Sequence, residues 1–364
     1  MKIVFLLGCL EPKKNGIADY SYALSKQLNM LGHSIYLIAW KDEYIPAETY
    51  VNKDLMLRMS PTLGAKEKQD LLKETLKNFN PDWVSIQFVA YSFHKKGLPF
   101  NLGSTWSFLS AYKVHIMFHE LWVEPTKSST IANNSFSMLQ EYLIKNFIKQ
   151  IGPSLITTSI LKYQEMLKPI KTNLLPLFGN VEIANKRNEI IKNKNQIKVI
   201  IFGNLTSDKA GFEQQIIWLN NLSNQLNKQI EILFLGRNGN LKKSYRGLIQ
   251  SIINNVVIQD LGELEVEVIS FQMLGADLGI SRANHENFGK SGSTIAMLEH
   301  GLPVLLRGSK NENTLLEFPG YKEQLLFGSN RIEALPEPKL GRNRQNESAK
   351  KLVGLLEESS VNKQ

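Results

Sequence analysis

The sequence predicts an α/β fold with two doubly wound, Rossmann-like domains that face each other across a cleft. The chain has 364 residues, which is enough for two domains of ordinary size. Both halves open in the same way, because a short apolar strand leads through a loop into a helix at 2–31 and again at 197–226. The stretch 182–196 between them is rich in Asn, Lys and Glu, which is typical of a linker.

These observations divide the chain into four segments. Residues 1–181 form the first Rossmann-like domain, 182–196 the linker and 197–341 the second domain. Residues 342–364 form a C-terminal helix, which we expect to pack back toward the first domain.

Hydrophobic periodicity predicts strands and helices that alternate along both halves. In the first half we expect strands at 2–8, 35–40, 83–88, 113–118 and 155–159, and helices at 17–31, 71–79 and 138–151. In the second half we expect strands at 197–203, 230–235, 256–258, 276–281 and 302–306, and helices at 212–226, 245–254 and 266–274, followed by one that Gly301 ends.

Charge and composition limit the possible binding partners and the cellular compartment of the protein. A net charge of +9 favours anionic substrates, an anionic membrane surface or nucleic acid. We disfavour nucleic acid, since the sequence has no zinc-ligand spacing, helix-turn-helix signal or aromatic RNA-binding pattern. The single cysteine, Cys9, excludes an intrachain disulfide framework and fits a reducing compartment.

The same reasoning predicts a cytoplasmic protein. The N-terminus enters a strand directly, without a signal-peptide pattern, and no apolar run approaches the roughly 20 residues that span a bilayer. Residues 138–151 mix lysines with large apolar residues, which leaves two alternatives. The helix packs its apolar side on the sheet, or it makes a peripheral contact with the inner face of the membrane.

Polar residues follow several predicted strands, and parallel sheets bind ligands beyond the carboxyl ends of their strands. In the first half these are the loop around Gly16 and the pair His119-Glu120. The loop lacks the Gly-x-Gly-x-x-Gly spacing, which disfavours a nicotinamide dinucleotide site. His119 is equally compatible with a buried structural role.

In the second half, three polar elements follow strands: the loop 204–211, the turn 236–239 and the loop 286–294. The last has glycines that allow close approach of a ligand, and its serines and threonine can cap the next helix. A helix N-terminus attracts phosphate, and Lys209 adds a point charge. The sequence therefore predicts a phosphate site here.

The order and spacing of these pieces resemble the GT-B glycosyltransferases of the family 4 type. The stretch 15–20 resembles the family's glycine loop, and 119–122 its first-domain histidine motif. The stretch 202–209 is similar to the family's strand with Gly-Arg-Leu and a following lysine, and 301–304 matches its Gly-x-Pro-Val.

The resemblance implies transfer of a hexose from a nucleotide sugar, a UDP-sugar such as UDP-glucose, to a hydroxyl acceptor with retention. It also implies bacterial polysaccharide or glycolipid assembly, a sugar or lipid-linked sugar acceptor, and neither metal nor other cofactor. Residues 1–181 would lie on the acceptor side, and 197–341 would bind the nucleotide sugar.

The resemblance also assigns roles to individual residues. The catalytic residues would be His119, Lys209 and Glu286. The residues expected to bind the donor are Gly16, Asn204, Arg237, Lys290, Ser291, Gly292, Ser293 and Thr294. On the acceptor side we expect Asp19, Glu120 and Trp122.

The chain departs from the family pattern at two positions. Asn204 stands where the family has the arginine that holds the diphosphate; Arg237, Arg282 or Lys290 could supply the missing charge. Thr294 stands where the family has its second glutamate, with seven residues between it and Glu286. These departures keep two alternatives open: an epimerase or phosphorylase of the same fold, and a non-catalytic nucleotide-binding protein.

Overall fold

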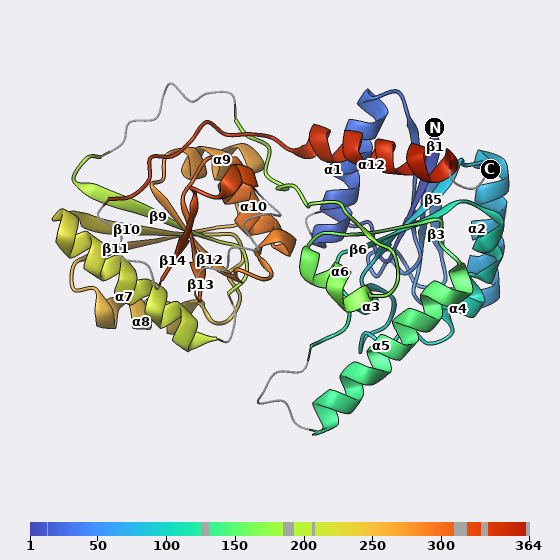
Figure 1. The fold of residues 1–364 in the computed structure, drawn as a ribbon, viewed down its shortest axis with the longest axis horizontal. Helices are drawn as coiled ribbons and strands as arrows, with labels where there is room; N and C mark the ends of the chain where they lie inside the picture. Colours follow the sequence, from blue (N-terminus) through green and yellow to red (C-terminus); the bar gives the residue numbers. More distant parts are fainter. Residues whose placement is uncertain are drawn as a thin grey trace. The chain divides into compact units, whose positions relative to one another are not determined.

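The computed structural model describes residues 1–12, 14–124, 131–184, 193–205, 208–308, 319–328 and 334–361. They form two compact units. Unit 1 comprises Met1–Leu175 and the C-terminal segment from Gln345, and unit 2 comprises Pro176–Arg344. Each unit is a mainly parallel sheet with helices on both faces (Figure 1). The predicted fold class, two doubly wound α/β domains, is confirmed.

Within the described residues of unit 1, eight strands form one sheet in the order β3-β4-β2-β1-β5-β6-β7-β8, parallel except for the β3–β4 hairpin. The strands are β1 (Lys2–Leu7), β2 (Ser34–Ala39), β3 (Tyr50–Lys53), β4 (Met56–Met59), β5 (Trp83–Phe88), β6 (Val114–Phe118), β7 (Leu155–Thr158) and β8 (Asn173–Leu174). The helices are α1 (Gly16–Met30), α2 (Ala65–Phe79), α3 (Ala90–Phe93), α4 (Leu102–Thr105), η1 (Ser107–Ala111), α5 (Ile131–Ile151), α6 (Leu161–Leu167) and α12 (Gln345–Val361).

Side chains that alternate along β1 build a core on each face of the unit 1 sheet. Val4 and Leu6 belong to the cluster that also contains residues of α2 and α5. Ile3 and Phe5 point to the opposite face and are fully buried. Helices α1 and α12 lie side by side (Figure 1), so the C-terminal segment completes this unit.

Unit 2 contains a parallel sheet whose described strands run in the order β11-β10-β9-β12-β13-β14. The strands are β9 (Gln196–Phe202), β10 (Gln229–Leu235), β11 (Val256–Gly262), β12 (Leu278–Asn284), β13 (Val304–Arg307) and β14 (Leu325–Phe327). The helices are α7 (Lys209–Leu226), α8 (Lys242–Ile252), α9 (Val266–Leu274), η3 (Phe288–Lys290), α10 (Gly292–Glu299) and η4 (Pro319–Tyr321).

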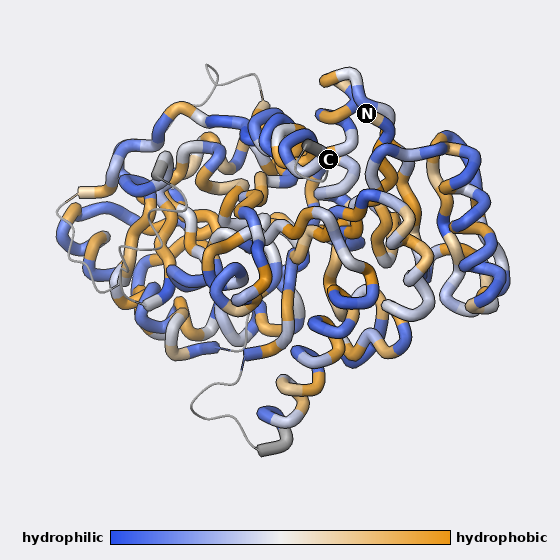
Figure 2. Tube along the Cα trace, turned by 45° about the vertical axis from the view of Figure 1, so that its right-hand side comes forward, coloured by the Kyte–Doolittle hydropathy of each residue, from blue (hydrophilic) through white to orange (hydrophobic). Residues whose placement is uncertain are grey.

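The unit 2 sheet is covered on both faces as well. Val199 and Ile201 of β9 cluster with apolar residues of α7 and α8. Ile200, which points the other way, clusters with residues of α9 and α10. In Figure 2 hydrophobic residues follow the inner strands, whereas the outer helices alternate between hydrophobic and hydrophilic residues. Because the strands are parallel, the loops that follow β9, β10, β12 and β13 share one edge of the sheet.

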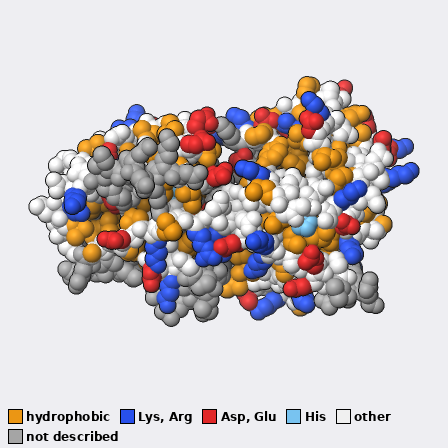
Figure 3. Space-filling view, turned by 90° about the horizontal axis from the view of Figure 1, so that it is seen from above, with side chains coloured by type: hydrophobic (Ala, Val, Ile, Leu, Met, Phe, Trp, Pro, Cys, Tyr) orange, Lys and Arg blue, Asp and Glu red, His pale blue; other side chains and the backbone are white. Residues whose placement is uncertain are grey.

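The distribution of charge on the surface is relevant to the predicted alternatives of membrane and nucleic-acid binding. On the face drawn in Figure 3, basic and acidic side chains are interspersed rather than separated by sign. None of the helices in the described part of the chain is long and apolar enough to cross a membrane.

Candidate functional site

The amino end of α10 presents backbone N–H groups beside a serine cap. Ser291 is the N-cap residue, and its Oγ accepts a hydrogen bond from the N–H of Thr294 at 3.4 Å. The first N–H groups of the helix, on Gly292 and Ser293, make no hydrogen bond within the described residues. These two donors and the helix dipole attract negative charge.

The side chain of Thr294 supports this turn from inside. Thr294 is fully buried, and its hydroxyl donates to Ser291 Oγ at 2.8 Å while lying 2.6 Å from Ser281 Oγ. Ser281 belongs to β12, so the cap is fixed to the sheet. The hydroxyl of Thr294 therefore shapes the loop, whereas Ser291, Gly292 and Ser293 are partly exposed.

The loop that follows β9 packs directly against this cap. Gly203 has φ +86°, and a Cβ atom there would lie 3.2 Å from Ser293 Cβ. A larger residue would be strained and would push the two loops apart. Asn204 comes next and is exposed. Two predicted donor-binding stretches, around Asn204 and Ser293, therefore do meet at this edge.

Lys209 is the first residue of α7 and is exposed. The N-cap residue Asp208 accepts a hydrogen bond from the N–H of Gly211 at 3.1 Å, which fixes the start of this helix. The loop residues 206–207, which precede it, lie outside the described residues.

Arg307 is a cation of this edge that sequence reasoning missed. It ends β13, its side chain is 8% exposed, and its Nη1 donates to Asp208 Oδ2 at 2.7 Å. Its Nε has no hydrogen-bond partner in the described part of the chain. The pair joins β13 to the first turn of α7 and places the guanidinium group beside Asp208, the residue that precedes Lys209. The available signal was an arginine directly after the apolar strand 304–306.

The other candidate cations differ in their surroundings. Arg237 is exposed and forms a surface ion pair with Glu263, with Nε and Oε1 at 2.9 Å. Arg282 is exposed on β12, and Lys290 is half-buried at the end of η3. Arg307 is the most rigidly held of the four, because it is the most buried and is tied to a helix cap.

Glu286 lies on the exposed part of the loop after β12. Its N–H donates to Asn284 Oδ1 at 3.1 Å, and its carboxylate is 3.8 Å from His285 Nε2. Glu299, at the far end of α10, is instead buried against the backbone of Gly179, where an added Cβ would lie 2.8 Å from Oε2. Of the two carboxylates, only that of Glu286 reaches solvent at the binding edge.

In unit 1, His119 follows β6 and is only 6% exposed. Its Nε2 lies 2.9 Å from Oε1 of Gln87, on the neighbouring strand β5. The amide nitrogen of Gln87 donates to Ser85 Oγ at 2.8 Å. Ser85 Oγ in turn lies 2.8 Å from Nδ1 of His115. A series of buried hydrogen bonds therefore crosses the sheet from His119.

Thr157, at the far end of this hydrogen-bond series, fixes the direction of every bond in it. Thr157 donates its hydroxyl hydrogen to the sulfur of Met117 at 3.0 Å, because a thioether can only accept. Thr157 Oγ1 must then accept from Nε2 of His115, 2.8 Å away. Nδ1 of His115 consequently accepts from Ser85, which accepts from the amide of Gln87.

The direction sets the tautomer of His119. The oxygen of Gln87 faces the ring and can only accept, so the hydrogen of His119 is on Nε2. Burial lowers the pKa of His119 to about 3, which keeps the ring neutral near pH 7. Nδ1 is then a hydrogen-bond acceptor, and it has no partner among the described residues.

Helix α1 brings further predicted residues to His119. Asn15 caps the helix by accepting a hydrogen bond from the N–H of Ile17 at 2.9 Å. The ring of Tyr20 packs edge-on against that of His119, with centroids 4.9 Å apart. Gly16, which is exposed, and Asp19, which is half-buried, precede Tyr20 in the same first turns.

The remaining acceptor-side residues lie just beyond His119. Glu120 is exposed. Trp122 is 9% exposed, and the ammonium of Lys145 lies 5.7 Å from its ring centroid. The indole ring is therefore mainly part of the core, while the carboxylate of Glu120 is accessible.

Comparison with known proteins gives no match to a family model and no match among curated proteins. Solved structures do match over the whole chain. Sucrose-phosphate synthase from Thermosynechococcus elongatus has a TM-score of 0.58 at 13% identity, covering 100% of this chain and 97% of that one. Anabaena HepE in complex with UDP-glucose has a TM-score of 0.53 at 13% identity, with 100% and 99% covered.

The chain has the GT-B fold. A third structure extends the likeness to another reaction, since the UDP-GlcNAc 2-epimerase from Neisseria meningitidis has a TM-score of 0.51 at 12% identity, with 98% and 100% covered. Identities this low establish the fold alone. The resemblance predicted from the sequence is thus confirmed in its architecture.

Proposed function

We propose that the protein is a glycosyltransferase that transfers a hexose from a UDP-sugar, such as UDP-glucose, to a hydroxyl acceptor with retention. The observation that carries the proposal is the position of the α10 N-terminus in unit 2. It shares a sheet edge with Lys209 and Arg307. The structural likeness to proteins solved with UDP-glucose and UDP supports a nucleotide diphosphate as the anion.

The proposed chemistry follows from the charge that develops on the leaving group. As the bond between the sugar and the diphosphate breaks, negative charge grows on the phosphate oxygens. The N–H groups of Gly292 and Ser293 and the cations Lys209 and Arg307 stabilise it, so we propose a metal-independent reaction. Ser291 caps α10 and so holds these N–H groups in place. Asn204 and Lys290 provide further polar contacts to the nucleotide sugar at the same edge of the sheet.

In this proposal the donor sugar is held by hydrogen bonds. The carboxylate of Glu286 accepts from its hydroxyl groups, and the neutral His119 accepts from one hydroxyl through Nδ1. With retention, the leaving phosphate itself takes the proton of the acceptor hydroxyl. Asp19 and Glu120 then orient the acceptor, a sugar or lipid-linked sugar in bacterial polysaccharide or glycolipid assembly.

The experiment is a thermal-shift screen of UDP-, GDP-, ADP- and TDP-sugars, followed by product analysis with hydroxyl acceptors. We expect UDP-sugars to raise the melting temperature. The shift should disappear in Lys209→Ala and persist in Lys350→Ala, which removes an exposed lysine of α12. The absence of any response to the whole panel would contradict the proposal.

The second candidate function is a nucleotide-sugar epimerase, favoured by the likeness to UDP-GlcNAc 2-epimerases. Incubation with the donor alone separates the two. An epimerase converts the donor without an acceptor, whereas a transferase leaves it intact apart from slow hydrolysis. Conversion of a UDP-sugar to its epimer in the absence of acceptor would replace the first proposal by the second.

A further inference from the structure

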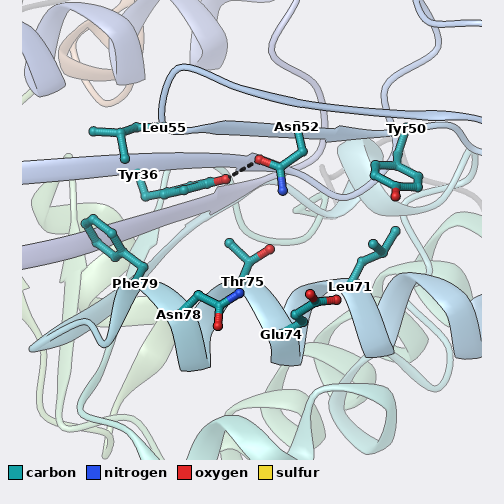
Figure 4. Close-up of a pocket in the computed structure, with 9 residues that line it drawn as sticks. All are labelled: Tyr36, Tyr50, Asn52, Leu55, Leu71, Glu74, Thr75, Asn78 and Phe79. Atoms are coloured by element: carbon teal, nitrogen blue, oxygen red, sulfur yellow. Dashed lines mark hydrogen bonds between the residues drawn. The ribbon is translucent and has the colours of Figure 1, made fainter.

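Unit 1 contains a pocket with a volume of about 290 Å³ between helix α2 and the sheet edge formed by β2, β3 and the turn between β3 and β4 (Figure 4). The strand order places β3 five positions from β6, which His119 follows. At about 4.8 Å per strand, β3 is roughly 24 Å from β6 across the sheet, and β2, which contributes Tyr36 to the pocket, is roughly 14 Å from it. The pocket is therefore separate from the candidate site of this unit.

Side chains from two directions converge on the pocket. Leu71, Thr75 and Asn78 follow one another at helical spacing on one face of α2. Opposite them, the hydroxyl of Tyr36 donates to Asn52 Oδ1 at 2.6 Å. This bond occupies the amide oxygen and leaves the NH2 group of Asn52 turned toward α2 (Figure 4).

The polar lining has unused hydrogen-bonding capacity. The side chains of Tyr50, Glu74, Thr75 and Asn78 make no hydrogen bond within the described residues, and the NH2 group of Asn52 is also unpaired there. Together they offer hydroxyl, amide and carboxylate groups, which both donate and accept. Such a mixed set suits a ligand that carries several hydroxyl groups.

Aromatic rings supply the apolar part of the lining. The rings of Tyr36 and Phe79 pack edge to face, with centroids 5.3 Å apart, and form one wall. Tyr50 is 47% exposed, and Leu55 at the turn is 51% exposed. Large apolar side chains that remain exposed around a hollow are typical of binding surfaces.

The charges near the pocket disfavour ionic ligands. Glu74 is the only ionised group among the lining residues, so an anion would be repelled. The ammonium of Lys2 already lies 5.7 Å from the ring centroid of Phe79, which disfavours a second cation there. The lining accordingly selects a neutral ligand with both apolar faces and hydroxyl groups.

We propose that this pocket is a saccharide-binding site that holds a neutral sugar unit of a glycan. Its volume is at the small end of ligand pockets, which fits one or two sugar units. The choice of saccharide among neutral polyhydroxyl ligands rests on the proposed glycosyl transfer. A glycan held here at a distance from the reacting end would raise the effective concentration of acceptor.

The test is saturation-transfer NMR of the full-length protein with glucose, galactose, N-acetylglucosamine and maltotriose, each without nucleotide. Choline and inorganic phosphate serve as ionic comparison ligands. Binding is then measured in Tyr50→Ala and Asn78→Ala, which alter opposite sides of the pocket. Tyr44→Ala is the matched control, since Tyr44 is 53% exposed and does not line the pocket.

We expect at least one neutral saccharide to bind, with affinity reduced about tenfold or more in both pocket variants and unchanged in Tyr44→Ala. A tenfold change corresponds to about 1.4 kcal/mol, the scale of one lost ring contact or hydrogen bond. No saccharide binding, binding unaffected by both variants, or preference for choline or phosphate would overturn the proposal. The response to UDP-sugars is measured separately, so failure of the proposed transfer is distinguishable from failure of this site.

Discussion

Replacing Gln87 with glutamate tests how the hydrogen-bond series of unit 1 controls His119. The side chain keeps its shape, but a carboxylate oxygen now takes the place of the amide oxygen of Gln87. That amide oxygen lies 2.9 Å from Nε2 of His119. Two charges about 4 Å apart attract by about 4 kcal/mol at an effective dielectric constant of 20. Since one pKa unit is about 1.4 kcal/mol, the pKa of His119 should rise by roughly three units, into the range near 6.

The functional consequence has a definite sign. A raised pKa means that His119 gains a proton as the pH falls through about 6, and its Nδ1 then ceases to be an acceptor. In Gln87→Glu, kcat/KM should therefore fall below about pH 6, whereas the wild type, with a pKa of about 3, should show no such step. Nitrogen-15 NMR of the imidazole reads the proton on Nδ1 directly.

Gln140→Glu provides the matched control, because Gln140 is also fully buried in unit 1 but bonds to Val123 and Gly97 rather than to a histidine. It buries a carboxylate at a comparable structural cost and should leave the titration of His119 unchanged. The reasoning is refuted if His119 in Gln87→Glu stays neutral with hydrogen on Nε2 throughout pH 5 to 8. It is refuted equally if the control shows the same new step.

Three further predictions concern other parts of the chain. Arg307→Ala should weaken UDP binding about tenfold in equilibrium titrations while Arg307→Lys retains most of it, because the charge is one of several at that edge; equal affinities in both variants would contradict this. Burial lowers the pKa of both His115 and His119 from 6.5 to about 3, and the neighbouring His119 contributes to the shift of His115. The neutral folded forms then stabilise unit 1 fully above about pH 6.5 and less as the pH falls, by roughly 2 kcal/mol per histidine between pH 7 and 5; an unchanged urea midpoint over this range would argue against it. Met138 and Tyr142 of helix α5 are 69% and 66% exposed. Co-sedimentation with anionic vesicles at low salt should therefore decrease in the double variant Met138→Gln/Tyr142→Gln but not in Met30→Gln. The absence of any co-sedimentation would contradict a membrane contact through this helix.

The fold was predictable because both halves repeat the same apolar pattern of strand, loop and helix. The hairpin β3–β4 was missed, since all four residues of β3 are exposed and leave no apolar alternation to detect. Helix α2 begins six residues before its predicted start for a similar reason: residues 65–70 are mostly polar, and the apolar face begins at Leu71. Short edge elements carry little signal of this kind.

The site was predictable only where one segment contains all of its parts. The cap at Ser291 is visible in the sequence, because capping residues and glycines are neighbours there. Arg307 and Asp208 are 99 positions apart, and only the parallel sheet brings them together. Ser85 and Gln87 give a partial signal, as two polar residues at period two in an otherwise apolar strand, but their histidine partners depend on strand register.

The central claim is that the edge of unit 2 holds a nucleotide diphosphate, and calorimetric affinities of UDP and uridine test it most directly. Hydrogen bonds to charged groups contribute about 1.5–3 kcal/mol each. Two or more such contacts among α10, Lys209 and Arg307 predict that UDP binds at least a hundredfold more tightly than uridine, with an advantage that shrinks as salt increases. Equal affinities for UDP and uridine would contradict the account.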